Sequence, residues 1–159
     1  MAPGAGSAER PNAFRQGLPY AGLLIGVWAA AAPYVLLGPD LNAAAKNEFA
    51  DHVVPGLLTI VLSAAMIART RSATSTTPTG SFPLLAGFGV LLAGLWMTAT
   101  HFPLVKDARN DLVATDVTAW HTVPGLVVLA LGAGWAAAHW SDAADQPVPD
   151  GAAKAKSER

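Results

Sequence analysis

The chain has 159 residues, a formal net charge of −1 and only 13% charged residues. This balance gives no electrostatic case for nucleic-acid binding, and the lack of cysteine excludes disulfides, thiolate metal sites and covalent c-type haem attachment. The mean hydropathy of +0.37, with charges crowded between long apolar segments, indicates a membrane protein.

Four apolar segments are long enough to cross a bilayer, which takes roughly 20 residues and at least about 17. The expected helices cover residues 18–37, 52–68, 82–99 and 117–140. None of them has a charged face, which argues against a soluble four-helix bundle. The sequence therefore predicts an all-α fold, a four-transmembrane-helix bundle.

The polar and charged segments divide the chain into regions. We expect disordered cytoplasmic tails at residues 1–15 and 141–159, because both are rich in Ala, Gly, Pro, Ser and mixed charge. Residues 16–140 form the predicted four-helix membrane domain. A polar loop from Arg71 to Gly80 divides that domain into two halves.

The distribution of lysine and arginine predicts the orientation, because these residues resist translocation whereas acidic residues carry little topological weight. The two tails and the middle loop hold seven of them: Arg10, Arg15, Arg69, Arg71, Lys154, Lys156 and Arg159. The two remaining loops hold three: Lys46, Lys106 and Arg109. We therefore expect a multi-pass protein of the cell membrane with both termini in the cytoplasm.

Two stretches of the first half recur in the second. Leu24–Trp28 resembles Leu92–Trp96 at an offset of 68 residues, and His52–Leu57 resembles His121–Leu126 at an offset of 69. An even number of spans in each copy gives both copies the same orientation, related by a pseudo-two-fold axis along the membrane normal. The pattern predicts two tandem, parallel-repeated helical hairpins. The two copies are expected over about residues 18–70 and 82–140.

The first copy places Gly26-Val-Trp28 in an apolar helix, followed by a proline and an aromatic residue near its outer end and by a polar loop. The next helix begins with a polar residue and glycine. This arrangement resembles the SPW-repeat integral membrane proteins, which are named for a Ser-Pro-Trp at that outer end. The equivalent triplets are Ala32-Pro33-Tyr34 and Thr100-His101-Phe102, so the naming triplet is degenerate in both copies. The resemblance covers about residues 18–140 and implies no activity or catalytic residue.

Three histidines are the candidate ligands. The predicted axis carries His52 onto His121 at equal depth near the outer surface, where the pair could ligate a haem iron or another metal. His101 lies on the same side as a third contributor, whereas His139 falls on the opposite side. A histidine at a helix end also suits the wet interfacial zone without a ligand. Since His52 and His121 precede the apolar cores, we expect that they do not face each other across a metal.

Two Pro-Gly pairs, Pro55-Gly56 and Pro124-Gly125, occupy matching places in the two halves. A proline inside a helix frees the carbonyl four residues earlier, and matched interruptions are typical of a transporter's binding site. An ordinary helix start is the favoured interpretation, because both pairs lie at the predicted membrane edge. No charged residue lies at the predicted midplane of any helix, which argues against a proton relay or an ion-coupled pump.

Small and aromatic residues predict how the helices pack. Gly22 and Gly26 allow close backbone approach, and we expect this to serve packing within the bundle rather than oligomerisation. Trp28 and Trp96 recur at matching positions and are expected in the bundle core.

No nucleophile and base pair, phosphate loop or metal motif can be assembled from these residues. The sequence therefore predicts no enzyme, no catalytic residue, no cofactor and no metal site. The leading hypothesis is an accessory or scaffolding component of the cytoplasmic membrane, in contact with the lipid bilayer and with further copies of itself or other membrane proteins. The alternatives are haem or metal binding through His52 and His121, and a small-molecule transporter.

Overall fold

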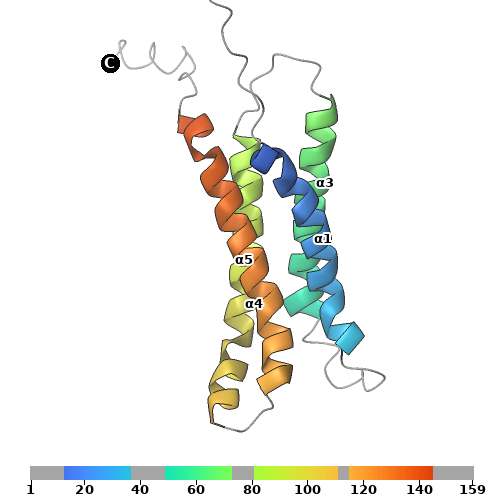
Figure 1. The fold of residues 1–159 in the computed structure, drawn as a ribbon, viewed down its shortest axis with the longest axis vertical. Helices are drawn as coiled ribbons and strands as arrows, with labels where there is room; N and C mark the ends of the chain where they lie inside the picture. The colour runs from blue at the N-terminus through green and yellow to red at the C-terminus, as the bar shows by residue number, and fades with distance from the viewer. Residues whose placement is uncertain (1–12, 37–48, 73–80, 111–114, 145–159) are drawn as a thin grey trace, which may run out of the picture.

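The computed structural model describes residues 13–36, 49–72, 81–110 and 115–144. Within these ranges the chain is all-α (Figure 1). The elements in chain order are α1 (Ala13–Leu36), a π-helix η1 (Phe49–Val53), α3 (Val54–Ser72), α4 (Phe82–Arg109) and α5 (Thr115–Ala144). The predicted number and order of the helices are confirmed.

Several helix ends differ from the expected ones. α4 continues ten residues past 99, through Pro103, and α5 begins before 117 and ends after 140. α1 begins at Ala13, so residues 13–15 of the predicted tail are helical. Charged and polar residues can extend a helix beyond the bilayer core, so hydropathy alone underestimates helix length. Residues 141–144 of the other predicted tail are also helical, as the end of α5, and the rest of both tails lies outside the described residues.

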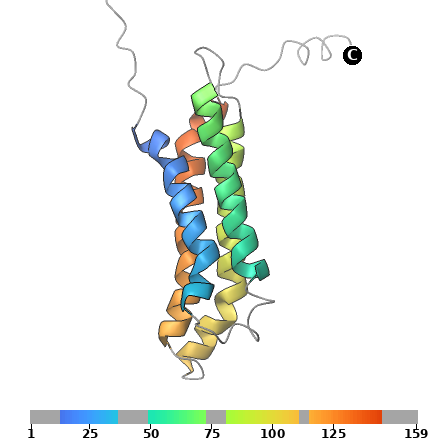
Figure 2. The ribbon, with the colours of Figure 1, turned by 90° about the vertical axis from the view of Figure 1, so that its right-hand side faces the viewer.

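The four α-helices lie side by side as an antiparallel bundle, seen from two directions in Figures 1 and 2. At the top of Figure 1 α1 and α4 begin and α3 and α5 end. α4 packs most extensively on α5, and α1 on α3, while the contacts of α1 with α5 and of α3 with α4 join these two hairpins.

Three segments have the length and composition of membrane spans: Phe49–Ser72, Phe82–Pro103 and Thr122–Trp140. Large apolar side chains face outward along them, among them Val61, Leu92 and Leu126. The chain is therefore a multi-pass membrane protein in contact with the lipid bilayer.

Glycine sets the spacing of the two hairpins. A Cβ built on Gly56 of α3 would meet the backbone nitrogen of Ala30 in α1 at 2.8 Å. A Cβ built on Gly125 of α5 would meet the backbone nitrogen of Thr98 in α4 at 2.9 Å. Both glycines of the Pro-Gly pairs thus serve helix contacts. Pro124 lies inside α5, nine residues after Thr115, so the interpretation as a helix start is wrong for this proline.

A second pair of close approaches lies one to two turns further along the helices. A Cβ on Gly26 would meet the backbone of Ile60, and a Cβ on Gly94 would overlap the backbone of Leu129. A Cβ on Gly22 would overlap Ser63. The expectation that Gly22 and Gly26 pack inside the bundle is confirmed.

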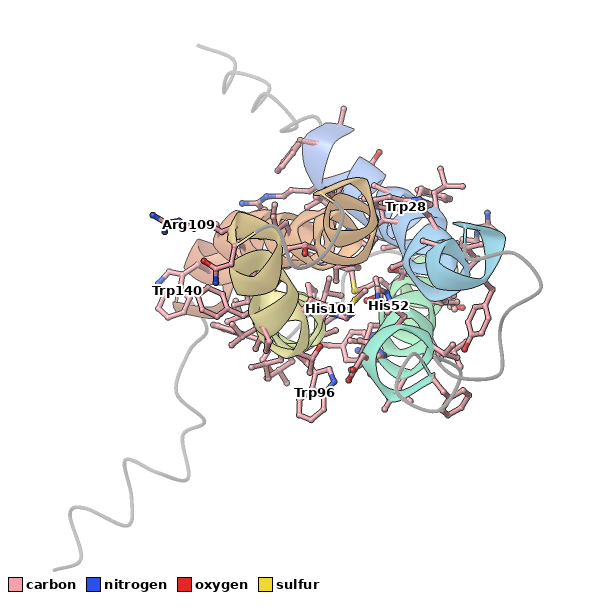
Figure 3. All side chains as sticks on the ribbon, turned by 90° about the horizontal axis from the view of Figure 1, so that it is seen from below. Trp28, His52, Trp96, His101, Arg109 and Trp140 are labelled. Atoms are coloured by element: carbon pink, nitrogen blue, oxygen red, sulfur yellow. The ribbon has the colours of Figure 1, made fainter. Side chains whose placement is uncertain are left out.

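The core is built mainly from inward-facing residues of α4 and α5. The fully buried apolar side chains include Val90, Met97, Val128 and Trp135. Trp96 is 56% exposed and points away from the bundle in Figure 3. The prediction that Trp96 lies in the core is wrong, because successive helical residues differ by about 100° and its neighbour Met97 takes the inward position.

Candidate functional site

Two of the three candidate histidines come together in the bundle interior. His52 of η1 and His101 of α4 face each other in Figure 3, with their Nε2 atoms 3.0 Å apart. The ring centroids are 4.6 Å apart and the rings are inclined by 65°. His52 is 0% exposed and His101 4%. We call these two residues the histidine pair.

A π-helical turn positions His52. Pro55 has no N–H and cannot bond to the carbonyl of Asp51, four residues earlier, and the chain enters α3 at this point through the wider turn η1. His52 then lies on the buried side of the helix, in line with Thr59 and Ser63. The inner side of this element therefore carries a stripe of polar residues.

The hydrogen bonds of His101 determine which ring nitrogen carries a proton. Its Nδ1 lies 2.7 Å from the carbonyl oxygen of Met97, and a carbonyl can only accept, so Nδ1–H is the donor. In a neutral His101 the Nε2 atom is then an acceptor. His52 must donate its Nε2–H across the 3.0 Å contact. One proton therefore lies between the two Nε2 atoms. This hydrogen bond would be lost if both rings carried a proton on Nε2.

The histidine pair meets some requirements of a metal site and lacks others. The hydrogen bond from Nδ1 of His101 to a carbonyl is the usual way in which a metal-bound imidazole is oriented. Zinc takes four ligands, with N to metal distances of about 2.0–2.1 Å. Two imidazole nitrogens in a tetrahedral site would then be about 3.3 Å apart, slightly more than the 3.0 Å between the Nε2 atoms of the pair. Among the described residues no group of three or more His, Cys, Asp or Glu side chains could hold a metal ion.

The predicted pairing of His52 with His121 falls outside the described part of the structure. Residue 121 lies in α5, but its side chain lies outside the described part of the structure. A haem or metal ligated by His52 and His121 therefore stays a hypothesis. A haem between His52 and His101 would need about 4 Å between the two nitrogens across its iron, whereas their hydrogen bond closes that gap to 3.0 Å.

The pairing of His52 with His101 could have been found from the sequence. His52 lies 20 residues before the end of α3 at Ser72, and His101 lies 19 residues after the start of α4 at Phe82. Residues at equal distances from the connection of two antiparallel helices lie at the same level. Sequence reasoning followed the internal repeat instead and so paired His52 with its repeat equivalent.

Other buried polar groups continue inward from the histidine pair. Thr59 donates its hydroxyl to the carbonyl of Pro55 at 2.9 Å. Ser63 Oγ and Trp135 Nε1 are buried and have no hydrogen-bond partner among the described residues. A Cβ on Gly22 would contact both side chains, so the two groups lie near each other in the middle of the bundle. Unsatisfied polar groups of this kind each cost about 1–3 kcal/mol.

An apolar groove of about 390 Å³ opens on the outer face between α3 and α4. Its walls include Pro55, Leu58, Leu92 and Trp96, of which the last three are exposed. Neither histidine of the pair lines it. A groove of this composition suits lipid chains, so it adds little to the hypothesis of a transporter for a polar substrate.

Comparison of the chain with protein-family models, with curated proteins and with solved structures finds no match.

Proposed function

We propose that this protein is a non-enzymatic accessory or scaffolding component of the cytoplasmic membrane, built from four spans and two hairpins that the histidine pair fastens into one unit. The observation that carries the proposal is the buried hydrogen bond between His52 and His101. It joins the start of the second span to the third, and so joins the two hairpins. Both rings are closed off from solvent, which suits a role in fixing helix arrangement better than a role in turning over a substrate.

The proposal includes membership of the SPW-repeat family and a tandem repeat of the two hairpins. The paired close approaches support the repeat. Gly56 against Ala30 corresponds to Gly125 against Thr98, at the same offsets of 69 and 68 residues that relate the sequence matches. Gly56 and Gly125 belong to the matched stretches His52–Leu57 and His121–Leu126, so one pair of matched residues makes two equivalent helix contacts.

A second equivalence involves other residues. Gly26 approaches the backbone of Ile60, and Gly94 approaches that of Leu129, again at offsets of 68 and 69. Glycine at both crossings is required by the close approach of backbone, and a duplication explains why the requirement recurs.

The proposal counts α1 as the fourth span. α1 has 24 residues, and the sequence from Gln16 to Pro39 has no charge. It packs on α3 and α5 along the bundle, as a span would. With four spans both termini lie on one side, and the excess of lysine and arginine in the tails and middle loop assigns that side to the cytoplasm.

Single cysteines test this topology cleanly, because the natural chain has none. In intact cells a membrane-impermeant maleimide should label Ala43→Cys, whereas Ser75→Cys and Ser157→Cys should react only after permeabilisation. The unsubstituted chain is the control for background labelling. External labelling of Ser157→Cys would contradict the four-span arrangement.

The accessory role is tested by isolation in mild detergent followed by native mass spectrometry. We expect a defined complex with a second copy of the chain or with another membrane protein. The control is an untagged strain carried through the same isolation. A monodisperse monomer without any partner would count against a scaffolding role.

A second candidate function is metal binding at the histidine pair, which the oriented imidazole of His101 favours. Equilibrium dialysis with Zn²⁺ or Cu⁺ tests it on the full chain, together with a visible absorption spectrum for haem. Binding of one ion per chain, lost in His52→Leu and kept in His139→Leu, would support it. Absence of tightly bound metal in the unsubstituted protein would reject it.

A further inference from the structure

A cavity of about 280 Å³ lies at the end of the bundle opposite the histidine pair. It lies where α1 and α4 begin and α3 and α5 end, at the top of Figure 1, and all four helices contribute to its walls. This is the end that carries Arg69 and Arg71 in the last turn of α3.

Basic and hydrogen-bonding side chains surround the cavity. The polar residues that line it are Arg15, Gln16 and Tyr20 of α1, Thr70 and Arg71 of α3, and His139 of α5. No Asp or Glu is among its described lining residues. A cavity whose described lining includes two arginines and several neutral polar residues, and no carboxylate, is suited to an anion such as a phosphate.

The floor of the same cavity is apolar. Met66 and Ile67 are buried there, and Pro19 and Pro83 complete the floor. A free phosphate would leave this surface without a partner, whereas an anionic lipid places a phosphate next to hydrocarbon. Basic cavities between transmembrane helices at the headgroup level bind anionic lipids in this way.

We propose that this cavity binds the phosphate headgroup of an anionic phospholipid, with Arg15 and Arg71 holding the phosphate and Met66 and Ile67 contacting the glycerol and the start of an acyl chain. Assignment to the cytoplasmic leaflet rests on the proposed orientation, but binding itself does not.

The structure supplies a matched control on the same helix turn. Arg69 is also a basic residue at the end of α3, but its guanidinium carbon lies 4.7 Å from the centre of the Phe82 ring and it does not line the cavity. Arg69→Gln therefore removes the same charge as Arg71→Gln from nearly the same place. Diffuse attraction to anionic lipid predicts equal effects, and a built site predicts unequal ones.

The test is a titration of the full chain with phosphatidylglycerol in mild detergent, read by native mass spectrometry, with phosphatidylcholine as the reference lipid. A basic residue near an anionic headgroup is worth about 1 kcal/mol, so each of Arg15→Gln and Arg71→Gln should weaken binding roughly fivefold and the double variant roughly 25-fold. Arg69→Gln should change it by less than about twofold. Unchanged thermal stability of each variant shows that folding is not the cause.

Three results would overturn the proposal. Equal binding of phosphatidylglycerol and phosphatidylcholine by the unsubstituted protein would contradict a site for an anionic lipid. An equal loss in Arg69→Gln and Arg71→Gln would reduce it to diffuse charge. Binding of inorganic phosphate with the same arginine dependence, without preference for phosphatidylglycerol, would assign the cavity to a free phosphate compound instead of a lipid. Cysteine labelling decides the orientation separately, so a failure here leaves the four-span proposal standing.

Discussion

Substitution of the histidine pair gives the sharpest measurement of what it contributes. In His101→Leu the Nε2–H of His52 stays buried without its acceptor, and in His52→Leu the Nε2 of His101 stays buried without its donor. Leaving one such group unsatisfied costs about 1–3 kcal/mol, and measured hydrogen bonds inside membrane proteins average about 0.6 with a maximum of about 1.7. We expect each single substitution to lower the free energy of unfolding by about 1–2 kcal/mol.

The double variant His52→Leu/His101→Leu removes donor and acceptor together. Replacing both partners by apolar groups is nearly neutral, so we expect a loss below about 1 kcal/mol instead of the roughly 2–4 that additivity would give. The assay is reversible unfolding in mixed micelles of mild detergent and dodecyl sulfate, followed by tryptophan fluorescence, to which the buried Trp135 contributes. Additive losses, or single variants as stable as the parent, would refute the hydrogen bond as the fastening between the hairpins.

The remaining predictions use the same preparation. Gly94→Ala should destabilise the bundle by more than about 2 kcal/mol, because its Cβ would overlap the backbone of Leu129. Gly134→Ala should be neutral or stabilise by up to about 1 kcal/mol, because nothing lies within 4 Å of its Cβ. Equal free energies of unfolding for the two variants would contradict the packing. Ser63→Ala should stabilise by up to about 1 kcal/mol, since it removes a buried hydroxyl that has no partner in the described part of the chain; a clear loss would indicate a bound water there. Brominated lipid quenches tryptophans that face the bilayer, so Trp96→Phe should show less quenching than the unsubstituted protein. Equal quenching of the two would contradict the outward position of Trp96.

Hydropathy alone predicted most of the fold. Four apolar segments separated by charged ones became four helices in the expected order, because in lipid the backbone must satisfy its hydrogen bonds within each segment. The helix ends were less predictable. α4 runs through Pro103 to Arg109, beyond the apolar stretch, and hydropathy carries no information on a helix that continues into water.

The inward face of each helix was harder to predict, because helices in lipid have apolar residues on all sides. The small residues were the useful signal: Gly22 and Gly26 do lie in helix contacts. Recurrence in the two halves was misleading for tryptophan. Trp96, which matches Trp28, faces outward, whereas Trp135, which has no matching tryptophan in the first half, lies in the core. Burial in a membrane bundle follows close approach and shape rather than hydrophobicity.

The candidate site shows how one backbone feature can determine both a span and a site. α3 alone has 19 residues, close to the shortest length for a span, and η1 extends it to the 24 residues of Phe49–Ser72. Pro55 follows this π-turn closely, and its missing N–H leaves no α-helical bond to the carbonyl of Asp51 that the wider turn would have to break. Regular α-helix in its place would turn His52 by up to about 100°, away from His101. The proline that the sequence offered as an interruption therefore lies next to the π-turn that directs a histidine into the contact between the two hairpins.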